Sequence, residues 1–269
     1  MLVLIKGAGD LATGTALRLY RAGMQVVMTD LPQPLAVRRT VAFSQCIYDG
    51  TAQVEGVSAR HVPDCSGAEE ALSRGEIPVL ADPEARIRTR MPFDAVVDGI
   101  LAKRNLGTAI TDAPVVLALG PGFTAGTDCH AVVETQRGHH LGRLILEGSA
   151  APNTGIPGDI GGYTTQRVIR ACGSGRLRPA VRIGDQVAAG DIVAWVEETP
   201  IRAQIPGIVR GMLPEGCPVT PGLKTGDIDP RCTYDHCFTV SDKARAIGGG
   251  VLEGLLYFTA GPGRAAAGR

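Results

Sequence analysis

The first thirty residues contain the pattern that most constrains the fold. An apolar run at residues 2–5 leads into a glycine-rich turn at residues 7–14, and a second apolar run at residues 26–28 is followed closely by Asp30. Strand, glycine turn, helix, strand and acidic residue, in this order, are typical of a mononucleotide-binding βαβ unit. We therefore expect a parallel sheet whose first turn meets a phosphate-bearing ligand at a helix N-terminus.

The residues of the glycine turn (residues 7–14) and the acid that follows have separate predicted roles. Gly7 permits the tight turn, and Gly9 lets backbone N–H groups approach a phosphate. Ala12 is small where the helix packs on the strand, and Asp30 is placed to accept a hydrogen bond from a ribose hydroxyl. Asp10 is unexpected, because its charge repels a pyrophosphate unless a cation intervenes. The predicted cofactor-binding residues in this region are Gly7, Gly9, Asp10, Ala12, Thr13 and Asp30.

The pattern of short apolar runs indicates an α/β protein with a Rossmann-like parallel sheet covered on both faces. We expect helices at residues 35–48 and 67–73, and strands at residues 54–62, 77–80, 95–98, 115–119, 131–134 and 141–146.

From about residue 176 the sequence changes to short β segments separated by Gly and Pro. A Gly-x-x-Val-x-x-Gly element occurs at residues 184–190 and again at residues 216–222, which predicts two copies of a small β unit packed face to face. The run resembles the barrel-sandwich fold of biotinyl and lipoyl domains. No lysine occurs at residues 197–202, where those carriers hold their modified lysine, so we expect a structural or docking role.

The predicted domains are a Rossmann-like α/β domain (1–164), a small β barrel-sandwich domain (165–240) and a C-terminal helix with a tail (241–269). Ser241 is the expected N-cap of that helix, and residues 261–269 are expected to be disordered.

Composition excludes several classes of partner. The 27 basic and 27 acidic side chains cancel, which argues against binding to duplex nucleic acid or to an anionic membrane surface. No apolar run approaches the length of a transmembrane helix. The seven cysteines are odd in number and scattered, as suits reduced thiols. We expect a soluble cytoplasmic protein without a membrane or nucleic-acid partner.

Two further clusters follow predicted strands and are candidates for the same ligand crevice. The loop after residues 115–119 contains Gly120 and Gly122, and the polar stretch at residues 134–143 contains Arg137, His139 and Arg143. A plain loop and a solvated charged loop are the alternatives. The Cys-x₄-Cys spacing at residues 232–237 lacks the second ligand pair of a structural zinc site, so no metal site is predicted.

The order of motifs resembles one family along nearly the whole chain. The chain is similar to the YqeB-type family of selenium-dependent molybdenum hydroxylase accessory proteins. The residues that carry this resemblance are residues 7–14, 38–43, 48–50, 54–57, Asp98, 103–105, 119–126, 134–139, 141–143 and 224–231.

The resemblance implies a role in the maturation of a molybdenum hydroxylase, with a nucleotide or a molybdopterin-type cofactor bound near the glycine turn. On this hypothesis Arg137 and Arg143 hold anionic groups of the cofactor, and Cys46, Cys65 or Cys129 contacts molybdenum, sulfur or selenium. An NAD(P)-dependent oxidoreductase and a non-catalytic docking scaffold for the hydroxylase are the alternatives.

Overall fold

The computed structural model describes residues 1–262 and divides into two compact units. Unit 1 contains Met1–Pro34, Ala42–Asn153 and the chain from Val240 onward, and unit 2 contains Leu35–Val41 and Thr154–Thr239. These boundaries differ from the predicted ones. The final helix is part of unit 1, whereas residues 35–41 and 154–164 are part of unit 2. The predicted disordered tail lies, from residue 263 on, outside the described residues.

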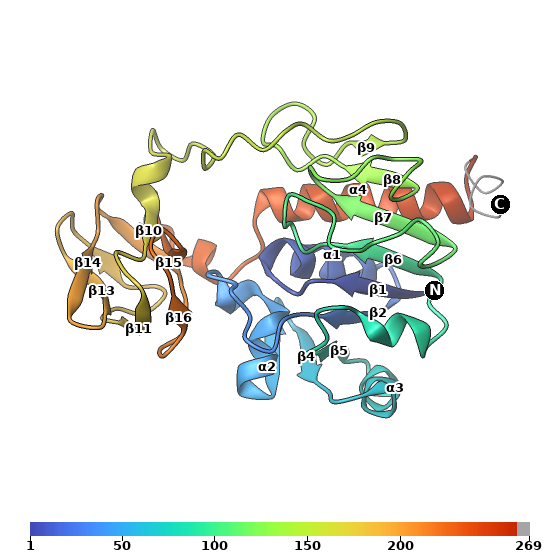
Figure 1. Cartoon of the computed structure of the whole chain (residues 1–269), viewed down its shortest axis with the longest axis horizontal. Coiled ribbons are helices and arrows are strands. Elements are labelled where there is room, and N and C mark those ends of the chain that lie inside the picture. The colour runs from blue at the N-terminus through green and yellow to red at the C-terminus, as the bar shows by residue number, and fades with distance from the viewer. Residues whose placement is uncertain (263–269) are drawn as a thin grey trace. The chain divides into compact units, whose positions relative to one another are not determined.

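Unit 1 is an α/β structure around a nine-stranded, mostly parallel sheet (Figure 1). The strand order is β3-β4-β5-β2-β1-β6-β7-β8-β9, with antiparallel pairing only at β3–β4 and β8–β9. The strands are β1 (Leu2–Lys6), β2 (Gln25–Thr29), β3 (Thr51–Val54), β4 (Val57–His61), β5 (Ile77–Leu80), β6 (Ala95–Asp98), β7 (Val115–Leu119), β8 (Ala131–Val133) and β9 (Leu144–Ile145). The chain order reverses beside β1, which makes the edge there a topological switch point.

The α-helices of the described chain all lie in unit 1. They are α1 (Asp10–Arg21), α2 (Cys46–Asp49), α3 (Cys65–Ser73) and α4 (Asp242–Thr259). The predicted alternation of strands and helices stops after β5, where the connections are irregular apart from a 3-10 turn at Arg86–Thr89. The last helix, α4, takes the place of the missing crossover helices, and Figure 1 shows it alongside α1.

The two faces of the sheet have different covers. Alternate strand residues such as Val116 and Val132 belong to a buried cluster with α3 and with Phe93 of the loop after β5. The residues between them face α4, where Leu117 and Val133 lie beside glycines of that helix. This alternation is what a strand buried on both faces requires.

Small residues let α4 lie very close to its neighbours. A Cβ on Gly14 of α1 would come within 2.6 Å of the Ala244 Cβ, and one on Gly248 within 3.0 Å of the Gly14 carbonyl oxygen. A Cβ on Gly250 would overlap the carbonyl oxygen of Gly142. Ser241 caps α4 as predicted, because its hydroxyl accepts from the Ala244 N–H at 3.2 Å.

The predicted helix at residues 35–48 is wrong. Only α2 is α-helical there, preceded by 3-10 turns at Arg39–Val41 and Phe43–Gln45. The physical reason is that Leu35–Val41 belongs to unit 2, where Val37 accepts a backbone hydrogen bond from Met212, so one continuous helix cannot form. The predicted strand at residues 54–62 is instead a hairpin of β3 and β4, turned at Glu55 and Gly56, which both have positive φ.

Unit 2 consists of two four-stranded antiparallel sheets, ordered β10-β17-β15-β12 and β14-β13-β11-β16, with one apolar core that draws on both. The strands are β10 (Val168–Arg170), β11 (Gly175–Pro179), β12 (Gln186–Val187), β13 (Ile192–Val196), β14 (Thr199–Arg202), β15 (Gly207–Met212), β16 (Pro218–Val219) and β17 (Lys224–Asp229). Each glycine repeat forms a turn and one two-residue strand, β12 or β16, and these strands lie in different sheets. Within residues 1–262, no helix has the length and apolarity needed to cross a membrane.

Candidate functional site

The loops that the sequence singled out meet at one edge of the sheet in unit 1. They follow the carboxyl ends of the adjacent strands β1, β6, β7 and β8. A Cβ on Gly7 would lie 2.9 Å from the Gly99 carbonyl oxygen after β6, and one on Gly122 would lie 2.5 Å from the Arg104 nitrogen. One on Gly120 would lie 2.5 Å from Thr135 Oγ1 after β8. Successive loops therefore touch where open α/β sheets bind ligands.

The glycine turn has the geometry of an anion-binding turn. Gly7 has φ +92° and donates its N–H to the Thr29 carbonyl at 2.8 Å. Gly9 is the N-cap of α1 and has no side chain to cap the helix, whereas the Asp10 carboxylate accepts from the Leu11 N–H at 3.0 Å within the first turn. A Cβ on Gly9 would meet nothing within 4 Å, so there is free space beside this residue. The remaining backbone N–H groups of a first helical turn bind anions readily.

Asp30 shapes the glycine turn from the end of β2. One carboxylate oxygen accepts from the Ala8 N–H at 2.8 Å and the other from the Leu31 N–H at 2.7 Å. Burial raises the pKa of Asp30, and these two backbone hydrogen bonds oppose that rise. The acid at this position thus holds the turn whether or not a ribose is present.

Thr13 and Ala12, both among the predicted cofactor-binding residues, have structural roles, and for Ala12 this is the packing role that the sequence predicted. Thr13 is fully buried, and its hydroxyl donates to the Ala8 carbonyl at 3.2 Å and accepts from the Phe43 N–H at 2.8 Å. Ala12 is 1 % exposed, and its methyl group would lie 3.2 Å from a Cβ on Gly99. Both residues fix α1 against the sheet and do not reach the open side of the turn.

A buried polar group under this edge was missed by the sequence reasoning. Lys6 ends β1 and Asp98 ends β6 opposite it; the Lys6 Nζ to Asp98 Oδ2 distance is 3.6 Å. The Thr108 hydroxyl bonds to both, at 2.5 Å from each, and all three residues are at most 3 % exposed. The sequence does contain a signal for this pair, because each of two apolar strands ends in a charged residue. Lys6 ends β1 directly before the glycine turn, and Asp98 ends β6.

Some side chains of the polar cluster at residues 134–143 stabilise the structure through hydrogen bonds and ion pairs, and others lie on the surface. Glu134 is buried, and its carboxylate accepts N–H bonds from Thr135, Gln136 and Ala151 at 2.7–2.8 Å. Arg137 forms a two-pronged ion pair with Asp242 of α4, at 2.7 and 2.9 Å.

The other members of the cluster lie on an exposed hairpin. The rings of His139 and His140 are edge to face, 5.0 Å apart. Arg143 lines a shallow depression together with Glu134, His140 and residues 144–147.

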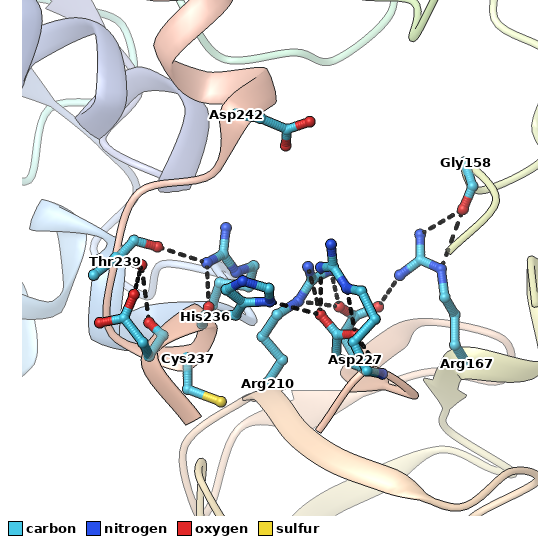
Figure 2. Close-up of polar contacts among 12 residues, drawn as sticks. Gly158, Arg167, Arg210, Asp227, His236, Cys237, Thr239 and Asp242 are labelled. Atoms are coloured by element: carbon cyan, nitrogen blue, oxygen red, sulfur yellow. Dashed lines mark hydrogen bonds and ion pairs between the residues drawn. The ribbon is translucent and has the colours of Figure 1, made fainter. Parts of the chain in front are cut away.

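Unit 2 contains a separate network of arginine and aspartate side chains, drawn in Figure 2. Asp227 and Asp229 of β17 flank the core residue Ile228 and are fully buried on the opposite face of the strand. Arg210 of β15 bonds to Asp227 at 2.8 Å and to Asp229 at 3.3 Å, and Arg167 also pairs with Asp227. Asp227 and Asp229 are therefore both bound by guanidinium groups. Within residues 1–262, no cluster of His, Cys, Asp or Glu has the makings of a metal site.

The network predicts an acid-sensitive unit 2. Burial acts to raise the pKa of Asp229, but the hydrogen bonds and charges of Arg231 and Arg210 outweigh it and lower the pKa to about 2. Because the folded-state pKa is below the usual value, this carboxylate stabilises the fold at pH values above its unfolded pKa, and the contribution is lost as pH falls towards 2. Asp229→Asn should therefore lower the denaturation midpoint strongly at pH 5 and by much less near pH 2.

Fluorescence of Trp195, the one tryptophan of the chain, reports this transition because it lies in β13 of unit 2. Glu198→Gln, which removes an exposed carboxylate from the same unit, is the matched control. Equal destabilisation by Asp229→Asn at both pH values would contradict the assignment.

The seven cysteines are all free. Cys46 and Cys129 have 0 % exposure, and burial raises the pKa of each thiol to about 12. A buried thiol held in its neutral form is a poor metal or selenium ligand. Of the three cysteines considered above for such a contact, only Cys65, at the start of α3, is partly exposed.

Unit 1 is thus an α/β unit with a nine-stranded, mostly parallel sheet, and unit 2 of the same chain consists of two small antiparallel sheets. The chain is a close homologue of the uncharacterized protein YqeB of Escherichia coli (strain K12), with 53% identity over 255 residues. The match covers 95% of this chain and 47% of the relative, so the chain spans about half the length of that protein. No family model matches the sequence.

Solved structures give only weak likenesses. An aspartoacylase family protein from Mesorhizobium loti matches with a TM-score of 0.29 and 15% identity, over 84% of each chain. A succinylglutamate desuccinylase/aspartoacylase from Rhodobacter sphaeroides matches with a TM-score of 0.27 and 15% identity, also over 84% of each chain. Scores of this size lend no argument about function.

Proposed function

We propose that unit 1 binds a phosphate-bearing ligand, a nucleotide or a molybdopterin-type cofactor, and that the protein serves in the maturation of a selenium-dependent molybdenum hydroxylase. The observation that supports the binding proposal is the N-terminus of α1 at the switch point of the sheet, where Gly9 has no capping side chain and has free space beside it. A Rossmann-like interpretation of unit 1 follows from the order β5-β2-β1-β6-β7-β8 of its parallel strands. The maturation role rests on the motif resemblance.

A docking role for unit 2 completes the proposal. Its two four-stranded sheets and the paired glycine turns support a barrel-sandwich interpretation. The turn between β13 and β14 holds Glu197 and Glu198 in place of a lysine that could carry a prosthetic group. We therefore assign unit 2 to recognition of the hydroxylase and unit 1 to the ligand.

Gly9→Val tests the ligand site directly. The valine side chain would occupy the open space before α1, so affinity for ADP or inorganic pyrophosphate is expected to fall at least tenfold in titration calorimetry, the loss expected for charge-assisted hydrogen bonds of about 1.5–3 kcal/mol. The backbone at Gly9 is extended, with φ −68° and ψ −177°, so valine fits without strain.

Gly173→Val in unit 2 is the matched control, because a Cβ there also meets nothing within 4 Å. Equal binding by the wild type and Gly9→Val would remove the site assignment. NADH binding accompanied by hydride transfer would favour the oxidoreductase alternative. The maturation role is tested separately by the selenium and molybdenum content of the hydroxylase from cells that lack this protein, which should fall.

A further inference from the structure

The outer face of one small sheet in unit 2 carries arginine side chains around the one tryptophan of the chain. In the sheet β14-β13-β11-β16, Arg178 of β11 pairs with Trp195 of β13, and Trp195 pairs with Pro200 of β14. The neighbours of Trp195 in β13 belong to the apolar core of unit 2, whereas Trp195 is outside that core and partly exposed. Because successive strand residues point to opposite faces of a sheet, these three residues form a row on the outward face.

Two further arginines extend this row, and the glycine turns hold both in place. Arg176 of β11 is exposed, and its guanidinium donates to the Gly216 carbonyl at 2.9 Å. Arg202 of β14 is also exposed and donates to the Gly190 carbonyl at 2.8 Å. Gly190 ends the first glycine repeat and Gly216 begins the second, so each repeat positions one guanidinium, which lowers the entropy lost on binding a partner. The arginine–tryptophan face, as we call it, consists of Arg176, Arg178, Trp195, Pro200 and Arg202.

The arginine–tryptophan face has an excess of positive charge. Within residues 1–262 none of its three arginines forms an ion pair. The Arg178 guanidinium lies 5.3 Å from the centre of the Trp195 ring, as in a cation–π contact, and makes no hydrogen bond in this part of the chain. The four strands contain no Asp or Glu; Glu197 and Glu198 lie beyond their ends, in the turn between β13 and β14. The face therefore complements a negatively charged partner.

Prolines disfavour binding of a partner along the edges of this sheet. The edge strands are β14 and β16, and they contain Pro200 and Pro218. Proline has no N–H group to donate to an added strand, so both edges are poor templates for strand addition. A partner is therefore expected to bind to the side chains of the outward face.

We propose that the arginine–tryptophan face binds an acidic protein segment, with an apolar side chain of the partner on Trp195 and its carboxylates on the surrounding arginines. This inference rests on the proposed docking role of unit 2 and adds to it the surface and the chemistry of the partner. Tryptophan and arginine are the residue types that contribute most to the binding energy of protein–protein interfaces. Single-stranded nucleic acid is bound by several aromatic rings that stack on successive bases, whereas this face offers one.

An acidic peptide tests the binding chemistry on the whole chain. The probe is a fluorescein-labelled peptide of about twelve residues in which Glu and Asp alternate with Leu, sized to cross the outward row of the sheet, and the same peptide with Gln and Asn is the neutral control. Fluorescence anisotropy should show that the acidic peptide binds more tightly and that salt weakens its binding. Binding should also change the fluorescence of Trp195, which a purely structural role of this residue would not do.

Variants of the face locate the contact. Replacing Arg176, Arg178 and Arg202 together by Gln should weaken peptide binding about tenfold, and Trp195→Ala should weaken it about thirtyfold. Arg170→Gln is the matched control, because Arg170 is an exposed arginine in the other sheet of unit 2 and also donates to a glycine carbonyl, that of Gly222, at 2.8 Å. This control should bind the peptide as the wild type does.

The inference is overturned if the wild type does not bind the acidic peptide, or if the triple Gln variant and Trp195→Ala bind it equally well. Binding of oligodeoxythymidylate or phosphatidylserine vesicles in preference to the peptide would also overturn it. Titration with a purified selenium-dependent molybdenum hydroxylase separates this failure from that of the docking role. Equal binding of the hydroxylase by the wild type and the triple variant refutes the face and keeps the docking role. Binding of the peptide but not of the hydroxylase refutes the docking role and keeps the face.

Discussion

Gly250→Ala is expected to destabilise unit 1 by about 2–3 kcal/mol, the upper range for overpacking a well-packed interior. The added methyl group would overlap the Gly142 carbonyl oxygen and lie 2.9 Å from Val133 Cγ1, so α4 must move away from the sheet. The measurement is thermal unfolding by far-UV circular dichroism, because α1, α2, α3 and α4 all lie in unit 1. A loss of this size corresponds to a midpoint lower by roughly 4–12 °C.

Gly249, next to Gly250 in α4, supplies a control substitution with the opposite expected effect on stability. A Cβ on Gly249 would meet nothing within 4 Å, so Gly249→Ala should stabilise α4 by up to about 1 kcal/mol through helix propensity alone. If both variants unfold at the same temperature, the close packing of α4 described above is incorrect.

Asp98→Ala should destabilise unit 1 by about 3–5 kcal/mol, because it leaves the Lys6 ammonium buried without its carboxylate. The Thr108 hydroxyl would also lose its acceptor. Replacing both members of the pair, as in Lys6→Met with Asp98→Leu, should cost much less than the sum of the single variants, because no charge is then left buried. Chemical denaturation followed by circular dichroism measures all three variants.

The prediction would be contradicted if Asp98→Ala lowered the free energy of unfolding only slightly and if the effects of Lys6→Met and Asp98→Leu on it simply added in the double variant. That result would mean that water reaches the Lys6 ammonium and that the pair is not buried. Arg60 and Glu76, a partly exposed ion pair in the same unit, provide the comparison: Glu76→Gln should cost no more than about 1 kcal/mol.

The sequence alone was sufficient to predict the elements whose formation depends on neighbouring residues. The glycine turn, the short apolar strands and the Ser241 cap follow from φ requirements, side-chain alternation and a hydroxyl at a helix start. The glycine repeat indicated the two turns of unit 2, because Gly184, Gly190, Gly216 and Gly222 all have positive φ.

Features that depend on distant pairing were not predictable. The apolar spacing at residues 35–48 favoured a helix, but hydrogen bonds of Val37 and Arg39 to Met212 in unit 2 prevent it. Lys6 and Asp98 are 92 positions apart, and only the register of β1 with β6 brings them together.

Because α4 follows unit 2 in the sequence, unit 1 can be completed only after unit 2 has been synthesised. The strands that α4 covers, β7, β8 and β9, leave the ribosome roughly a hundred residues ahead of it, with all of residues 154–239 in between. The faces of β7, β8 and β9 that pack on α4 therefore stay uncovered until unit 2 has been made.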